Sequence, residues 1–169
     1  YKRTATTELD TLARHHSPPV WWQERWWGDP HRACEKHRCP HQETATHMSR
    51  NCALETDTTG ISHHISHRVI EIGAVELIDG QLTGRQFHTY LQPQRSVDWG
   101  AQRVHGISDA MLVGKPLFSS KAAELLDFLR GSEMAAPNAT LDVGFLDNEL
   151  RLAGIPRSLA QYFRITCRL

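Results

Sequence analysis

The stretch HRVIEIGAVELIDGQLTGRQFHTYLQP, residues 67–93, decides the fold of this chain. Its first part, residues 67–78, is rich in β-branched side chains and predicts a long strand. Asp79-Gly80 is a dipeptide typical of hairpin turns, and residues 85–93 alternate until Pro93, as a return strand does. The stretch therefore predicts two antiparallel strands joined by a hairpin.

The segments on either side of this hairpin extend the sheet and cover it. Upstream, residues 51–56 are a short apolar run that ends at Thr59-Gly60, which predicts a third antiparallel strand. Downstream, the clearest helix is predicted over 119–131, with Ser119 or Ser120 as its cap. Strands first and helices later favour an α/β fold with helices flanking a mixed sheet. The remaining expected elements are a loop with a short helix over 96–107, a short strand over 133–136, a helix over 141–155 and a last strand over 162–167.

The composition narrows the classes of protein that fit. The chain of 169 residues carries 19 basic and 19 acidic side chains, so nucleic acid can be held only by a local surface and not by a global positive field. No apolar run approaches the roughly 18 residues of a membrane span, and no signal peptide is recognisable. Four unevenly spaced cysteines, with Cys52 in an expected buried strand, favour a reducing compartment.

Residues 1–47 differ in character from residues 48–169. The first part is crowded with Trp, His, Pro and Arg and shows neither helical nor strand periodicity, so we expect it to be poorly ordered or extraneous to the domain. It contains zinc-type ligands, but their spacing is tighter than in standard zinc fingers, and a chance cluster is favoured over a zinc-binding module. These ligands are Cys34, His37, Cys39 and His41, with His47 nearby.

Three carboxylates are the candidate chemical groups. Glu55 and Asp57 alternate in an expected strand and therefore share one face, and Asp142 opens the expected helix 141–155. Each acid alone is equally consistent with a solvated strand end or with a helix dipole effect. Together, at one edge of a sheet, they could hold one or two Mg²⁺ or Mn²⁺ ions.

The order of four motifs resembles a known family. ETDTTG (55–60), residues 67–93, RVHGISDAML (103–112) and PNATLDVGFLDNEL (137–150) are similar to the DEDD (DnaQ-like) 3′→5′ exonucleases, and in particular to the proofreading (epsilon) subunits of bacterial DNA polymerase III. The resemblance implies a ribonuclease-H-like sheet, with three antiparallel strands and two more. It also implies a bacterial cytoplasmic domain that hydrolyses DNA at a single-stranded 3′ end, beside polymerase alpha and a theta-type subunit.

The resemblance also implies roles for particular residues. Glu55, Asp57 and Asp142 match the metal ligands, and the substrate would contact Asp57, Thr58, Thr59, Gly60, His105 and Asn138. The family's first motif reads Asp-x-Glu-Thr-Thr-Gly, so the two acids are exchanged here. The second reads His-Asn-Ala-x-Phe-Asp, so Pro137 and Leu141 replace its histidine and phenylalanine, and Gly100 stands where an acid is expected.

The family's third motif, His-x₄-Asp, supplies the general base and is expected beyond residue 169. None of the eleven histidines is followed five positions later by an aspartate, so no catalytic base is assigned. The family function therefore competes with an alternative, an inactive or impaired remnant that only binds. Without a covering late helix, an apolar strip that includes Val69 is also expected to be exposed.

Overall fold

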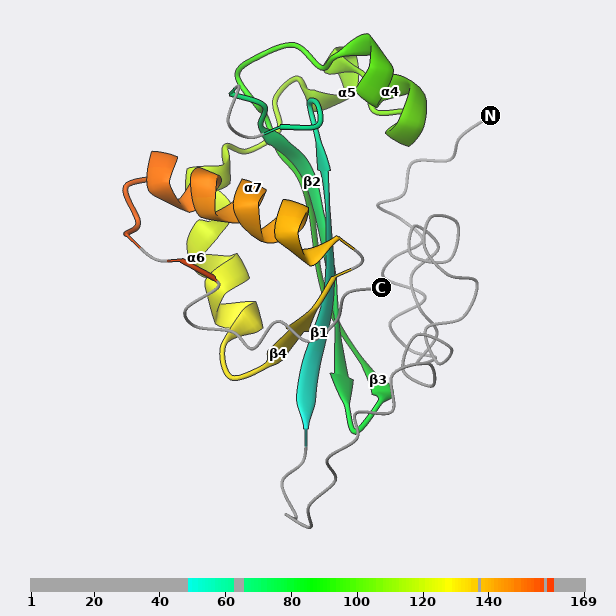
Figure 1. Cartoon of the computed structure of the whole chain (residues 1–169), viewed down its shortest axis with the longest axis vertical. Coiled ribbons are helices and arrows are strands. Elements are labelled where there is room, and N and C mark those ends of the chain that lie inside the picture. The colour runs from blue at the N-terminus through cyan, green and yellow to red at the C-terminus, as the bar shows by residue number, and fades with distance from the viewer. Residues whose placement is uncertain (1–48, 63–65, 137, 157, 160–169) are drawn as a thin grey trace.

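The fold is given by a computed structural model, which describes residues 49–62, 66–136, 138–156 and 158–159. Four described strands form one sheet in the order β3-β2-β1-β4. Figure 1 shows this sheet with its helices. The strands are β1 (Arg50–Thr58), β2 (Val69–Ile78), β3 (Gln81–Tyr90) and β4 (Glu133–Ala135). The helices are α4 (Trp99–His105), α5 (Asp109–Leu112), α6 (Phe118–Leu129) and α7 (Ala139–Leu152).

The predicted hairpin is confirmed. β2 pairs antiparallel with β1 on one side and with β3 on the other, and the turn between β2 and β3 is Asp79-Gly80. Asp79 and Gly80 both have positive φ, 49° and 79°, which is the conformation that two-residue hairpin turns require. β3 starts at Gln81 and so begins earlier than the sequence indicated, because strand pairing continues up to the turn.

β1 is longer than expected and carries both of its acids within the strand. It runs to Thr58, whereas the sequence predicted an end at residue 56. Pairing with β2 continues through the acids, with Glu55 opposite Gly73 and Asp57 opposite Glu71. The register shifts between Asp57 and Thr58, so an irregularity in the strand stands directly beside the acids.

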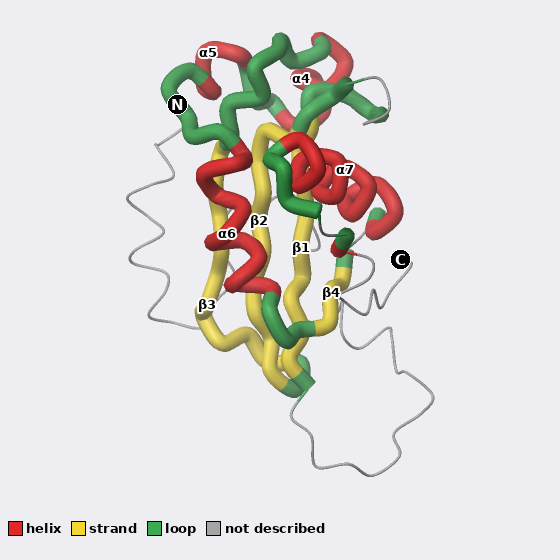
Figure 2. The backbone as a smooth tube through the Cα atoms, turned by 90° about the vertical axis from the view of Figure 1, so that its left-hand side faces the viewer, coloured by secondary structure: helices red, strands yellow, loops and turns green. Residues whose placement is uncertain are grey.

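Both long helices cover the same face of the sheet. Figures 1 and 2 agree that α6 and α7 lie on one face, while α4 and α5 lie at the end toward which β1 runs. β4 pairs parallel with β1, and α6 is the crossover that brings the chain back for this pairing. The main core, which includes Leu54, Ile72, Leu125 and Phe145, fills the space between this face and the two helices.

Two sequence-based expectations about these elements need correction, and one short helix was missed. Ser119 and Ser120 do not cap α6, because the helix begins one residue earlier and Leu117 takes the cap position without a side-chain hydrogen bond. The apolar strip around Val69 is not exposed there: Val69 is 1% exposed, since its side chain belongs to the core under α6 and α7. The short helix α5 was not predicted.

Other expectations lie outside the described residues. They are the properties of residues 1–47 with their candidate zinc ligands, and the last strand over 162–167. Of the described helices, none is long and apolar enough to cross a membrane.

Candidate functional site at the end of strand β1

The two acids of β1 share one face of the sheet. Glu55 and Asp57 are half-buried, whereas the alternate residues Leu54 and Thr56 are buried on the face that α6 and α7 cover. The predicted juxtaposition of Glu55 and Asp57 is therefore present. Both acids interact with other groups of the chain.

A third acid on this face, Glu71, was missed by the sequence analysis. Glu71 pairs directly with Asp57 across β1 and β2, so the two carboxyl groups are on the same side of the sheet. His88 of β3 brings its Nε2 within 2.7 Å of Glu71 Oε1, and the His88 ring meets the Tyr90 ring edge-on at 5.2 Å. A glutamate within a strand of β-branched residues was the sequence signal that could have drawn attention to Glu71. Only the register between β1 and β2 shows that Asp57 is its neighbour.

Asp142 reaches β1 from the first turn of α7. Its Oδ1 accepts hydrogen bonds from the Thr56 backbone N–H at 3.1 Å and from the Thr56 hydroxyl at 2.8 Å. Asp142 is 3% exposed, and this burial raises its pKa from 3.8 to about 6, against the lowering effect of the Thr56 hydrogen bonds. The third predicted carboxylate thus contacts the residue that stands between the other two.

The turn after β1 is fixed by buried hydrogen bonds. The Thr59 hydroxyl accepts from the Arg68 backbone N–H at 3.0 Å and lies 3.1 Å from Nδ1 of the buried His67. On the other side of the ring, His67 Nε2 faces Asp98 Oδ2 at 3.5 Å. The backbone N–H of Asp98 donates to the Thr59 carbonyl at 2.9 Å. The predicted substrate residue Thr59 is therefore committed to holding this turn.

Gly60 packs so tightly against His67 that no side chain fits there. A Cβ atom at residue 60 would stand 2.5 Å from His67 Nδ1 and 2.6 Å from Nε2. We expect Gly60→Ala to lower the free energy of unfolding by about 1–3 kcal/mol, since a buried ring must move. Gly100→Ala is the matched control, because a Cβ there meets nothing within 4 Å and α4 gains a helix former. Urea unfolding of both variants checks this; equal stability of the two would contradict the steric argument.

The other predicted substrate residues stand near helix ends. His105 is the last residue of α4 rather than part of a loop, and its Nδ1 accepts from the Ile107 backbone N–H at 3.0 Å. Asn138 stands before α7, and its carbonyl accepts from the backbone N–H groups of Leu141 and Asp142. Asn138 thereby sets the first turn that carries Asp142.

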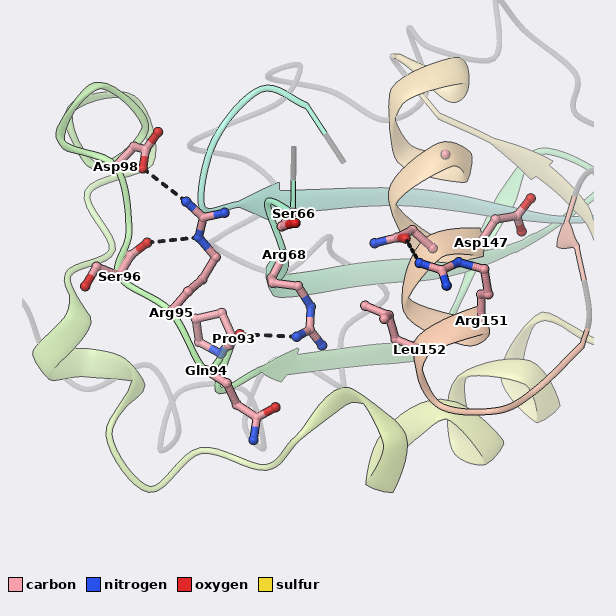
Figure 3. Close-up of a pocket in the computed structure, with 12 residues that line it drawn as sticks. Ser66, Arg68, Pro93, Gln94, Arg95, Ser96, Asp98, Asp147, Arg151 and Leu152 are labelled. Carbon is pink, nitrogen blue, oxygen red and sulfur yellow. Dashed lines mark hydrogen bonds and ion pairs between the residues drawn. The ribbon is translucent and has the colours of Figure 1, made fainter. Parts of the chain in front are cut away.

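A separate groove lies between α7 and the segment that follows β3. Figure 3 shows its lining side chains, and its volume is about 980 Å³. Arg68 is held there by Glu149, and Arg151 donates to Asn148 Oδ1 at 2.9 Å. None of the predicted site residues lines the groove. The lining consists of Ser66, Arg68, Pro93, Gln94, Arg95, Ser96, Asp98, Gly144, Asp147, Asn148, Arg151 and Leu152.

The metal-ligand hypothesis can be compared with this geometry. Carboxylate oxygens are suitable donors for a hard divalent cation, and a buried acid with a raised pKa is the kind of group that gains from one. The described residues nevertheless contain no group of three His, Cys, Asp or Glu side chains placed to hold a metal. Asp142 is directed at Thr56 on the helix side of β1, whereas Glu55 and Asp57 point to the opposite face.

Comparison with known proteins assigns the chain to a family. Residues 54–166, more than half of the chain, match the RNase_T family, which is described as "Exonuclease". The chain belongs to the RNase_T exonuclease family. The match begins in β1 at the acids and spans both the hairpin and α7, so it contains all three candidate carboxylates.

Curated relatives of this RNase_T domain confirm the resemblance found in the sequence. The DNA polymerase III subunit epsilon of Salmonella typhimurium is 46% identical over 112 residues, which are 64% of this chain and 46% of that protein. The same subunit of Buchnera aphidicola is 47% identical over 107 residues, 61% of this chain and 45% of that protein. The chain therefore spans about half the length of these relatives.

Solved structures show that the fold of this RNase_T domain is shared with ribonuclease-H-like exonucleases, as expected. The zinc ion bound form of an E. coli ExoI–ssDNA complex has a TM-score of 0.62 at 15% identity, covering 70% of this chain and 27% of that chain. E. coli Exonuclease I in complex with a dT13 oligonucleotide has a TM-score of 0.55 at 16% identity, covering 61% and 24%.

Proposed function

We propose that the chain is a 3′→5′ DNA exonuclease domain of the proofreading type. It would hydrolyse the terminal phosphodiester of a single-stranded 3′ end and release nucleoside monophosphates. The observation that carries the proposal is the match of residues 54–166 to the exonuclease family, which contains all three candidate carboxylates. Glu55 and Asp57 lie on one face of β1, and Asp142 from α7 is hydrogen-bonded to Thr56 between them. The similarity to epsilon subunits over this same region supports the proposal.

A divalent cation is part of this proposal. Glu55, Asp57 and Asp142 are the proposed ligands of Mg²⁺ or Mn²⁺, with two ions as in the resembling family. To join the other two, Asp142 would have to leave its hydrogen bonds to Thr56 on the opposite side of β1. When bound, such an ion supplies charge stabilisation at the phosphate and a more acidic water. Of the chain's own groups, Thr56 holds the Asp142 carboxylate by two hydrogen bonds, and Asn138 sets the turn that carries it.

The remaining proposed contacts concern the DNA end. The proposed contacts with that end are those that the resemblance implies: Asp57, Thr58, Thr59, Gly60, His105 and Asn138. The Thr58 hydroxyl donates to the Gly60 carbonyl at 2.6 Å, which keeps the turn in one conformation while a strand binds. A frayed 3′ end would enter more easily than a paired one, which provides selectivity for mismatched ends without base readout.

The partners follow from the relatives and are likewise proposals. Because the relatives are named as epsilon subunits of DNA polymerase III, the domain would work beside the polymerase alpha subunit and a small theta-type subunit, in a bacterial cytoplasm.

A second candidate function is a domain that binds DNA ends but cleaves them poorly. Two observations favour it: the described residues contain no three-ligand cluster, and the order of Glu55 and Asp57 is exchanged relative to the family motif. Each exchange moves a carboxylate by one methylene, on the order of 1.5 Å. A displacement of about 1 Å can lower a rate roughly a hundredfold.

The double variant Glu55→Asp/Asp57→Glu tests the two candidates against each other. We expect it to remove 3′ nucleotides from a 5′-labelled single strand about a hundredfold faster than the unaltered chain in Mn²⁺, because it restores the family's carboxylate positions. The unaltered chain should be slow, since no histidine in these 169 residues is followed by the motif's aspartate.

The assay is a denaturing gel with Asp142→Asn introduced into the double variant as the control. Cleavage that depends on Asp142 and accelerates in the double variant supports the exonuclease. Absence of cleavage in both proteins, with fluorescence anisotropy showing that both bind the strand, supports the binding domain instead. Cleavage that survives Asp142→Asn would show that these carboxylates are not the site.

A further inference from the structure

Helix α4 presents an exposed aromatic side chain next to the proposed site. Trp99, the first residue of the helix, is 72% exposed. The guanidinium carbon of Arg103, one turn later, lies 4.6 Å from the centre of the indole ring. None of the seven residues of α4 is buried, so the helix does not need Trp99 for the core. Tryptophan is enriched at interaction surfaces, and a cation over the ring holds the indole in place.

The structure fixes where this indole stands relative to the acids. Asp98, the residue before Trp99, donates its backbone N–H to the carbonyl of Thr59, two residues beyond Asp57. The same Asp98 approaches the buried His67 with its carboxylate. In Figure 1, α4 lies at the end of the sheet toward which β1 runs. Trp99 therefore stands just outside the strand end that carries Glu55 and Asp57, two of the proposed metal ligands.

We propose that Trp99 stacks on an unpaired base of the DNA strand that leads into the site, with Arg103 holding the indole and attracting the strand's phosphates. This inference rests on the proposed function and extends it to a contact outside the motifs that suggested that function. Every base offers a flat π face, so stacking on an indole suits a single strand of any sequence. A local contact of this kind is what a chain with equal numbers of acidic and basic residues requires, because it has no general positive field.

The groove of Figure 3 is the competing route for such a strand. Three arginines line it, but Arg68 is paired with the buried Glu149, and Arg95 lies 3.6 Å from the carboxylate of Asp98. Its lining contains no aromatic side chain. The groove thus offers little net positive charge and no stacking surface, whereas α4 offers both a cation and a ring.

The test measures the affinity of the full chain for two fluorescent probes by anisotropy. One probe is dT8 with phosphorothioate linkages that resist hydrolysis, and the other is an octamer of the same backbone without its bases. We expect Trp99→Ala to weaken binding of dT8 by about fivefold to a hundredfold, because one stacked base is lost. Trp99→Phe should stay within about threefold of the unaltered chain, and Trp99→Leu should behave like the alanine variant.

The controls separate stacking from other effects. The base-free octamer should bind equally to the unaltered chain and to Trp99→Ala. Val113→Ala removes an apolar side chain of similar exposure, 74%, from outside α4 and should leave dT8 binding unchanged. Retention of dT8 affinity within twofold in Trp99→Ala would overturn the inference. It would also be overturned if Arg151→Ala in the groove weakened binding while Trp99→Ala did not.

The proposed function can fail independently of this inference. If the gel assay shows no cleavage while Trp99→Ala still loses dT8 affinity, the exonuclease proposal is wrong and the stacking surface stands. If cleavage depends on Asp142 while Trp99→Ala binds dT8 normally, the opposite holds.

Discussion

Replacing Arg68 by alanine is expected to lower the free energy of unfolding by about 3–5 kcal/mol. Arg68 binds Glu149 of α7 through two hydrogen bonds of 2.7 Å, and Glu149 is only 1% exposed. Of the three hydrogen bonds described for the Glu149 carboxylate, only the one from the Val69 backbone N–H, at 3.1 Å, remains when Arg68 is removed. A buried charge with so little compensation is among the costliest defects in a folded protein.

Urea unfolding at neutral pH measures this cost. Arg151→Ala is the matched control, because Arg151 lines the same groove, is exposed, and bonds to the uncharged Asn148. It should change stability by no more than about 0.5 kcal/mol. The double variant Arg68→Met/Glu149→Leu should regain most of the loss, because it removes both buried charges. A small effect of Arg68→Ala, or no recovery in the double variant, would show that the ion pair does not hold α7 on β2.

Asp142→Asn is expected to have opposite effects on stability and on chemistry. Burial raises the folded-state pKa of Asp142 to about 6, above its ordinary value of 3.8. The folded state therefore favours the protonated acid. Below pH 3.8 the acid is protonated in both states, and the folded state has its full stability. As the pH rises from 3.8 toward 6, the unfolded state releases this proton more readily, and that stability is lost. Above pH 6 the acid is ionised in the folded state as well, and its burial costs roughly 3 kcal/mol. Asparagine is neutral and can still accept from Thr56, so it avoids this cost.

Thermal unfolding from pH 4 to pH 8 provides the measurement. At pH 8 the variant should be more stable by about 1–3 kcal/mol, and at pH 4 the two proteins should differ little. Asp127→Asn, at an exposed surface ion pair with Arg130, should leave the pH profile unchanged. Mn²⁺ should stabilise the unaltered chain more than Asp142→Asn, and the variant should lose metal-dependent cleavage. A variant that is less stable at pH 8 would contradict the assigned cost of burying this carboxylate.

Local patterns in the sequence were enough for most of the fold. The alternation and β-branched content of residues 67–93, with Asp79-Gly80 between two runs, predicted β2, the turn and β3. Hydrophobic periodicity predicted α6 within a few residues, because it depends on neighbours one turn away, and the helix predicted over 141–155 corresponds to α7. The boundaries of the elements were predicted less accurately. β1 continues to Thr58 because β2 pairs with it there, and α6 starts at Phe118 without a serine cap.

The candidate site divides in the same way. The sequence predicted that Glu55 and Asp57 share a face, because this depends only on the period of a strand. It did not predict Glu71 beside Asp57, since their pairing depends on the register between β1 and β2. The sequence also did not predict the contacts of Thr59 with His67 and Asp98, because these residues meet only after three segments have packed.

The sequence by itself determined the order of the elements, the alternation that places two acids on one side of β1, and the resemblance that names a nuclease family. Only the tertiary structure decided what each acid contacts. Asp142 meets Thr56 across 86 positions of the chain, and Arg68 meets Glu149 across 81. Contacts of this range are set by how α7 packs on the sheet and by strand register, and no local pattern of residues encodes either.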